Sequence, residues 1–255
     1  MRTLLLALSL SALFLTDLHA NLIQNPSFES GNTGFTSDYA FKATYRPPDL
    51  DEGQYQIVTN AFTQAHAAWS DLGAQSGTNY FVANASANTN LSPWMQSITI
   101  NPGDITTSTS NAPVYYRFQA YIASLYPVNP PQLSFEMSLN NSGTWQQLTT
   151  SLAPTNTGVW NLTYRDGYFT FAPTNISFRL RNALGELGGN DLAIDSLYFG
   201  FSTNAPAYDT ETTPINSIGP INGGVVPEPG AWAAAALLAG GAAFVRWRRR
   251  RVSAE

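Results

Sequence analysis

The chain is poor in the residue types that build most compact catalytic and metal sites. Its 255 residues include no cysteine and two histidines, and charged residues make up 11% of the total, against about 25% in an average soluble domain. Without cysteine there is no disulfide framework, thiolate metal site, iron–sulfur cluster or cysteine nucleophile. One of the histidines, His19, falls in a segment that we interpret as removed, which leaves His66 alone and excludes a histidine-rich zinc site. Aromatic residues, at 13%, still supply material for a core.

An apolar segment, Met1–Ala20, opens the chain. Arg2 supplies a short positive region, Leu4–Leu15 an apolar stretch, and Ala20 a small residue at a plausible cleavage position. This order predicts a secretory signal peptide that directs export through the Sec machinery and is then removed. The alternative is an N-terminal helix that is buried in the fold.

The C-terminal segment has three parts of different chemistry. Pro227-Glu228-Pro229 precedes an apolar run, Ala231–Val245, and five arginines follow it: Arg246, Arg248, Arg249, Arg250 and Arg251. As a helix the run is about 22 Å long, and snorkelling arginines can extend it toward the roughly 30 Å of a bilayer core. The arginines should stay on the cytoplasmic side, so the segment predicts one transmembrane helix. An alanine-rich core helix, the alternative, leaves the arginine cluster unexplained.

These three parts together resemble the PEP-CTERM sorting signal of exported bacterial proteins. The resemblance covers residues 227–251. It implies recognition by an exosortase, a membrane transpeptidase that would process the chain near Pro227–Pro229. The protein would then be anchored transiently in the inner membrane and released to the cell surface or extracellular matrix.

The body between the two ends, residues 21–226, is acidic. It holds six basic and fourteen acidic residues, a net charge of −8 that the arginines of the tail partly hide in the whole-chain value of −5. A net-negative body argues against nucleic acid as a partner. Its acidic and asparagine-rich segments suit cations and neutral sugars better.

The sequence of the body predicts an all-β domain. In residues 114–123, apolar side chains alternate with Tyr115, Arg117, Gln119 and Tyr121, the pattern of a half-buried strand. Other expected strands are 55–59, 80–83, 94–100, 133–139, 159–164, 168–171, 176–181 and 192–200. Many short strands with turn residues between them predict a two-sheet antiparallel β-sandwich or jelly roll over residues 21–201. Residues 202–226, rich in Thr, Asn, Pro and Gly, predict a flexible linker.

Two motifs at the ends of the body resemble the first and last strands of galactose-binding-like jelly rolls, the sandwich shared by many carbohydrate-binding modules. They are Asn21–Gly31 and Gly189–Leu197; residues 52–60, His66 and Trp69 add to the resemblance. It implies a carbohydrate-binding-module-like fold and a structural calcium ion between the two end strands. Carried over, the ligands are Glu29, Asp195 and the backbone of Ser27.

Charge repulsion between two carboxylates favours a cation at that junction. Glu29 and Asp195 would repel each other if the terminal strands lie side by side, unless a cation sits between them. The apolar pattern slips between Ile194 and Leu197, and a bulge there would expose Asp195. A further ligand could come from Asp49, Asp51 or Glu52. The alternative is two solvated loop carboxylates.

A sugar-binding face needs aromatic platforms and planar polar side chains. The outward stripe Tyr115, Arg117, Gln119 and Tyr121 has this composition. Glu136 and Arg179 would extend it from neighbouring strands. An ordinary solvent-facing surface is the alternative. We expect Trp69, Trp94, Trp145 and Trp160 in the core or at its rim, and His66 in local hydrogen bonds.

Together these features predict an exported, non-enzymatic surface or matrix protein that binds extracellular polysaccharide. One alternative is a structural matrix protein without a small ligand. Another is a glycosidase or lyase that uses Glu136 with Glu186 or Asp166, since a glycosidase needs two facing carboxylates. No nucleophile elbow, phosphate loop or metalloprotease motif accompanies those carboxylates.

Overall fold

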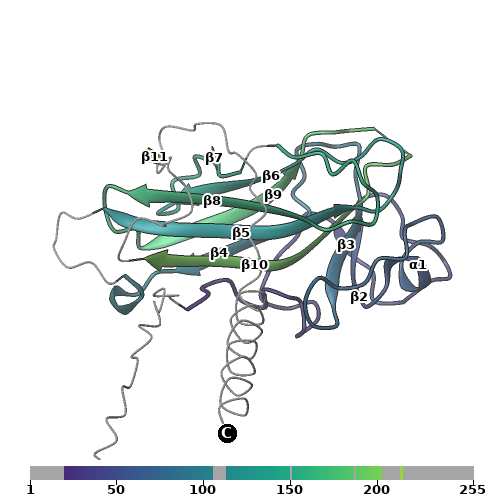
Figure 1. The fold of residues 1–255 in the computed structure, drawn as a ribbon, viewed down its shortest axis with the longest axis horizontal. Coiled ribbons are helices and arrows are strands. Elements are labelled where there is room, and N and C mark those ends of the chain that lie inside the picture. Colours follow the sequence, from purple (N-terminus) through teal and green to yellow (C-terminus); the bar gives the residue numbers. More distant parts are fainter. Residues whose placement is uncertain (1–19, 106–112, 150, 187, 203–212, 215–255) are drawn as a thin grey trace, which may run out of the picture. The chain divides into compact units, whose positions relative to one another are not determined.

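Two β-sheets pack face to face in the computed structural model, which describes residues 20–105, 113–149, 151–186, 188–202 and 213–214 (Figure 1). The expected two-sheet sandwich is therefore confirmed. Most strand pairs are antiparallel, and the parallel pairs are short ones at the edges of one sheet.

The large sheet has seven strands in the order β1-β2-β3-β10-β5-β8-β11. Their bounds are Ala40–Phe41, Gln54–Val58, Tyr80–Asn84, Leu192–Ser202, Val114–Ser124, Asn161–Phe169 and Thr213–Pro214. The small sheet has four strands in the order β4-β9-β6-β7. These are Met95–Thr99, Asn175–Asn182, Leu133–Leu139 and Gln146–Gln147. A short helix, α1 (Ala61–Gln64), and a 3-10 turn, η1 (Pro102–Asp104), complete the described elements.

The core between the sheets is aromatic. Phe118 of β5 packs on Phe135 of β6 with ring centroids 4.8 Å apart, and Phe178 of β9 packs on Phe199 of β10 at 4.9 Å. All four rings are fully buried. Buried and half-buried residues alternate along β9 and along β5 from Val114 to Tyr121, which turns every second side chain there outward. The outer faces of the two sheets therefore point away from each other.

A second apolar cluster lies outside the large sheet. Here α1 and the segment around it cover β2, β3 and the start of β10, and Trp69, Tyr80 and Val82 are buried beneath them. Asn60 caps α1 by accepting a hydrogen bond from the Thr63 amide. Figure 1 shows α1 and its loops gathered beside β2 and β3, away from the long central parts of β5 and β8.

One strand differs from the sequence expectation. Residues 159–164 and 168–171 were expected as separate strands, but β8 runs unbroken through Asp166 and Gly167. Both residues are typical of turns, and tertiary contacts override that preference. Asp166 pairs with Arg117, and a Cβ at Gly167 would meet the Tyr116 hydroxyl at 2.5 Å.

The expected bulge in the last strand is present. The pairing of β10 with β5 shifts between Asp195 and Tyr198, and Ser196 has φ of 51°. The expectation that this bulge exposes Asp195 is wrong, because Asp195 is fully buried. A loop of residues 70–79 lies over it and donates backbone hydrogen bonds to its carboxylate.

The signal peptide, the linker and the sorting segment lie almost entirely outside the described residues, as do Ala231–Val245 and the arginine cluster. Within the part of the chain that is described, no helix is long and apolar enough to cross a membrane.

Candidate functional site

The predicted sugar-binding residues fall on two opposite surfaces. Tyr115, Arg117, Gln119 and Tyr121 point outward from β5 in the large sheet. Glu136 and Arg179 lie on β6 and β9 of the small sheet, so the expectation that they sit on strands next to β5 is wrong. Apolar alternation tells which side chains face the core, but it does not tell which sheet a strand joins.

Tyrosines from three adjacent strands gather around the β5 stripe. In the register of the strands, Tyr115 faces Tyr168 of β8, and Gln119 lies between Tyr164 of β8 and Tyr198 of β10. We call this surface the tyrosine face. It comprises Tyr115, Arg117, Gln119, Tyr121, Tyr164, Asp166, Tyr168 and Tyr198. The rings of Tyr115 and Tyr168 meet edge to face with centroids 5.9 Å apart, which fixes their orientation.

An ion pair lies at the centre of the tyrosine face. Arg117 Nε donates to Asp166 Oδ1 at 2.6 Å, and Nη2 donates to Oδ2 in a second bond. Asp166 is fully buried and the Arg117 side chain is 21% exposed. Burial alone would lower the pKa of Arg117, but the hydrogen bonds and charge of Asp166 outweigh it and raise that pKa. The Arg117 guanidinium stays charged, and its two-pronged contact with Asp166 makes it a rigid element of the surface.

The ring of Tyr198 lies over its own strand, above Gly200. A Cβ at Gly200, directly across from Arg117, would collide with the Tyr198 hydroxyl. Burial raises the pKa of Tyr198, although the Arg117 charge opposes this. Arg117 also lies 5.8 Å from the ring centroid of Tyr164. Three half-buried phenol rings, those of Tyr115, Tyr168 and Tyr198, and the buried ring of Tyr164 therefore surround one charged pair.

The loop of residues 70–79 forms one border of the tyrosine face. Trp160, at the start of β8, donates from Nε1 to the Gly73 carbonyl at 3.0 Å. Asp195, whose register partner is Tyr121, accepts from the amides of Gln75 and Ser76 at 2.8 and 3.1 Å. The loop is therefore fixed to β10 and to the residue that precedes β8, two of the three strands that carry the tyrosines.

The expected calcium ligands hold this same loop. Glu29 Oε1 accepts from the amides of Thr78 and Asn79 at 2.7 and 2.8 Å. The other Asp195 oxygen accepts from the Ser196 amide at 2.6 Å. Burial raises the pKa of Asp195 to about 6, the three amides lower it, and the charge of Glu29 raises it further. The two carboxylates are thus close, as expected.

Oxygens of both carboxylates accept hydrogen bonds from backbone N–H groups. A calcium ion is instead surrounded by oxygen ligands. No group of three or more acidic or histidine side chains placed to hold a metal occurs among the described residues. Ser27, whose backbone was the third expected ligand, lies in the turn before Glu29. Glu29 and Asp195 therefore hold the 70–79 loop through its backbone amides, an arrangement that fits them better than calcium coordination does. Calcium binding stays a prediction.

The small sheet carries a second aromatic surface. Arg179 Nε donates to Glu136 Oε2 at 2.6 Å, across directly paired positions of β9 and β6. The Arg179 guanidinium lies 4.2 Å from the ring centroid of Trp145, just before β7. We call Glu136, Trp145, Gln147 and Arg179 the tryptophan face; Gln147 pairs with Glu136 in the strand register.

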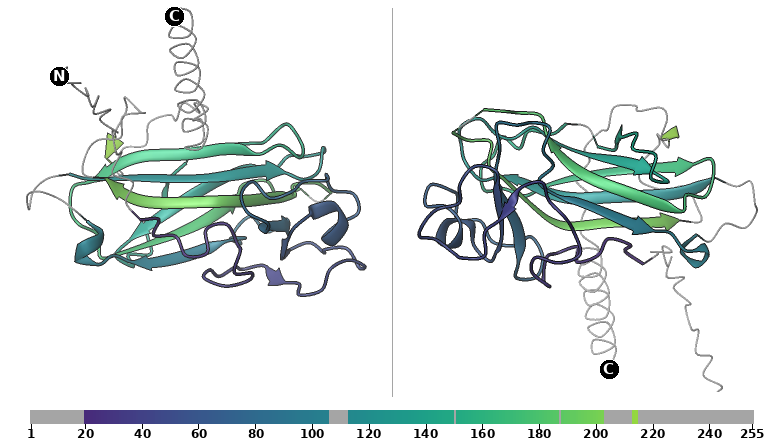
Figure 2. Two further views of the ribbon diagram at one scale, coloured as in Figure 1. Left: turned by 60° about the horizontal axis from the view of Figure 1, so that its bottom comes forward. Right: turned by 180° about the vertical axis from the view of Figure 1, so that it is seen from behind.

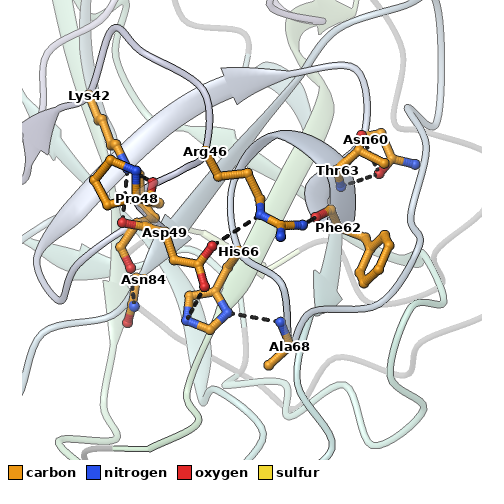
Figure 3. Close-up of polar contacts among 11 residues, drawn as sticks. Lys42, Arg46, Pro48, Asp49, Asn60, Phe62, Thr63, His66, Ala68 and Asn84 are labelled. Carbon is orange, nitrogen blue, oxygen red and sulfur yellow. Dashed lines mark hydrogen bonds and ion pairs between the residues drawn. The ribbon is translucent and has the colours of Figure 1, made fainter.

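The four tryptophans lie in the core or at its rim and His66 in local contacts, as expected. Trp69 and Trp94 are buried, whereas Trp145 and Trp160 are half-buried. Figure 3 shows His66 among polar neighbours: its Nδ1 accepts from the Ala68 amide at 3.1 Å, and its Nε2 lies 3.9 Å from Asp49. Its ring also stacks on Trp69 at 5.3 Å. His66 therefore serves local contacts.

Three tyrosines of the tyrosine face were missed from the sequence, Tyr164, Tyr168 and Tyr198, and Asp166 was considered only as a possible glycosidase acid. The alternation of Leu162, Tyr164, Asp166 and Tyr168 was available as a signal, but the turn-like Asp-Gly pair inside it hid the strand. Tyr198 lies after the bulge, where the alternation changes phase.

Comparison with known proteins identifies no family. No family model matches the chain, and no curated protein does. Among solved structures, the chain is similar to the CBM22-1 xylan-binding domain of Paenibacillus barcinonensis Xyn10C, with 10% identity, TM-score 0.46 and coverage of 73% of this chain and 97% of that one. TmCBM61, solved with β-1,4-galactotriose, gives 13% identity, TM-score 0.43 and coverage of 71% and 97%. The Stig cyclase FisC of Fischerella sp. TAU gives 13% identity, TM-score 0.44 and coverage of 71% of this chain and 96% of that one.

Proposed function

We propose that this protein binds extracellular polysaccharide and acts as an exported, non-enzymatic component of the cell surface or matrix. The observation that carries the proposal is the tyrosine face. Sugar rings bind through their apolar faces to aromatic rings and through their hydroxyls to planar polar groups. Tyr115, Tyr168 and Tyr198 supply the rings, and Gln119 lies between the tyrosines as a polar partner.

The rigidity of this face favours binding. Fixing a side chain on association costs roughly 0.5–1.5 kcal/mol. That cost is small where Tyr198 already lies against Gly200 and Tyr115 against Tyr168. The Arg117–Asp166 pair holds the centre of the array in place. A preformed aromatic surface whose one charged pair is internally neutralised suits an extended sugar chain in an otherwise acidic body.

One of the carboxylate pairs considered for catalysis, Glu136 with Asp166, is divided between the two sheets. Glu136 is paired with Arg179 on the small sheet and Asp166 with Arg117 on the large sheet, so these two acids lie on different surfaces. A glycosidase needs its two acids to face each other across the same sugar. We therefore propose binding without turnover.

Delivery to the cell surface is part of the proposal and rests on the sequence. The signal peptide would enter the Sec machinery, and the Pro227-Glu228-Pro229 segment would be read by an exosortase. Fractionation of cells that express the chain, with and without an exosortase, tests this. We expect release to the surface or matrix with the enzyme and retention in the inner membrane without it; release in both cases would contradict sorting.

The binding experiment uses the full-length chain in mild detergent against a panel of soluble polysaccharides. The panel includes xylan and β-1,4-galactan, the sugars named for two of the similar structures, and acidic polygalacturonate. Affinity electrophoresis should show retardation by at least one member. Y115A/Y168A should weaken it at least tenfold, whereas F171A, at an exposed ring outside both faces, should not.

The alternatives make different predictions for this panel. Absence of binding to every member would favour a structural protein without a ligand. A polysaccharide that is shortened by the wild-type chain but not by Glu136→Gln would favour an enzyme. Equal losses in Y115A/Y168A and F171A would also contradict the tyrosine face as the site.

A further inference from the structure

We propose that one molecule bridges two polysaccharide chains, with one chain bound on each face of the sandwich. This inference rests on the proposed function and extends it from simple binding to cross-linking. It comes from the finding that the predicted sugar-binding residues divide between opposite sheets.

The two faces point in opposite directions. β5 and β6 pack through Phe118 and Phe135, and β9 and β10 pack through Phe178 and Phe199. Packed sheets lie about 10 Å apart, and the side chains of each outer face add to that separation. Figure 1 shows the large sheet in front, and the view from behind in Figure 2 brings the small sheet forward. A short saccharide on one face cannot reach the other.

The tryptophan face is built as a platform of its own. Glu136 holds Arg179 through the bond from Nε and an ion pair from Nη2, at 2.6 and 2.5 Å. The guanidinium then lies against the Trp145 ring, an arrangement that is stabilising when the cation is partly desolvated. The successive contacts from Glu136 to Arg179 and from Arg179 to Trp145 thus fix the orientation of an indole ring at the surface. The polar side chain of Gln147 lies next to it.

This construction parallels that of the tyrosine face. In each case a cross-strand arginine–carboxylate pair, Arg117–Asp166 or Arg179–Glu136, stands next to an aromatic ring. Trp145 is itself partly exposed, whereas Tyr164 is buried and the partly exposed rings around it are those of Tyr115, Tyr168 and Tyr198. Because each face has both rings and planar polar groups, each can bind sugar without the other.

Stoichiometry tests the bridge directly. In calorimetry of the full-length chain with tetrasaccharides of xylan, β-1,4-galactan and galacturonate, too short to span both faces, we expect two molecules bound per chain. W145A and Y115A/Y168A should each reduce this to one, and the combined variant should bind none. R179Q should act as W145A does, because it removes the group that holds the indole. F171A should still bind two.

Cross-linking provides the second readout. With the full-length polysaccharides, light scattering should rise to a maximum at an intermediate ratio of protein to polysaccharide and fall in excess protein. W145A should abolish this maximum while retardation in affinity electrophoresis persists. Thermal melting monitored by circular dichroism confirms that each variant is folded.

The outcomes separate the bridge from the proposed function. If no probe binds the wild-type chain, the proposed function fails. If the wild-type chain binds one tetrasaccharide, or W145A and R179Q keep two, binding stands and the bridge is wrong. If the scattering maximum follows dimerisation of the protein in sedimentation, and is lost in a W145A variant that has become monomeric, the bridge is also wrong.

Discussion

Arg117 and Asp166 face each other across β5 and β8 and form a two-pronged ion pair beneath the tyrosine face. Asp166 has no exposed surface, whereas the Arg117 side chain is 21% exposed. A charge buried to this extent is tolerated only with its partner, because removal of one partner leaves the other uncompensated.

The cost of leaving Arg117 without its partner can be measured in the variant Asp166→Asn. We expect this variant to lower the free energy of unfolding by about 2–4 kcal/mol, because Arg117 keeps its charge without a counter-ion. Urea denaturation of the full-length chain measures the effect. R117M/D166L, which removes both charges, should recover most of the loss. An unchanged denaturation midpoint in Asp166→Asn would show that the pair adds nothing to stability.

Stability should fall as pH rises through the weakly acidic range. Burial raises the pKa of Asp191 to about 7, against hydrogen bonds from Trp69 and the Ala85 amide that lower it, and the pKa of Asp195 is raised to about 6. The folded state therefore binds more protons than the unfolded state between the ordinary value near 3.8 and these raised values. The contribution of these two carboxyl groups to stability is fully present at the acidic end of that window and is lost by about pH 7.

Thermal melting at pH 5 and pH 8 tests this, with a lower melting temperature expected at pH 8. D191N should remove most of the difference, because Asp191 has the larger shift and one of its buried oxygens has no hydrogen-bond partner. A melting temperature that rises between pH 5 and pH 8 in the wild-type chain would contradict the assignment.

Gly77 is required where the 70–79 loop meets Glu29. Its φ is +72°, and an added Cβ would collide with the Glu29 carboxylate. Gly77→Ala should therefore lower the free energy of unfolding by about 1–3 kcal/mol and loosen the loop. Gly31→Ala is the matched control: its φ is +68°, but nothing lies within 4 Å of the added Cβ. If both variants lose the same stability, only the backbone conformation matters and the contact with Glu29 does not.

The sequence predicted the sandwich because its strands alternate cleanly, as β5 and β9 show. It predicted the bulge as well, since Ile194 and Leu197 break the alternation. It could not place Glu136 and Arg179, because the sheet that a strand joins depends on contacts far apart in the chain. Nor could it predict that Asp195 is covered, because the amides that bind it come from residues 75 and 76, more than a hundred positions away.

Calcium provides the last test of the junction between the terminal strands. If the amide bonds to Glu29 and Asp195 are sufficient, the melting temperature of the full-length chain should be the same in excess calcium and in excess EDTA. If the predicted ion binds there, calcium should raise the melting temperature, since a ligand that binds only the folded state stabilises it. D195N would distinguish a site at this junction from weak binding elsewhere. In D195N a calcium-dependent shift should disappear if Asp195 is a ligand, and should persist if the ion binds to another acidic part of the body.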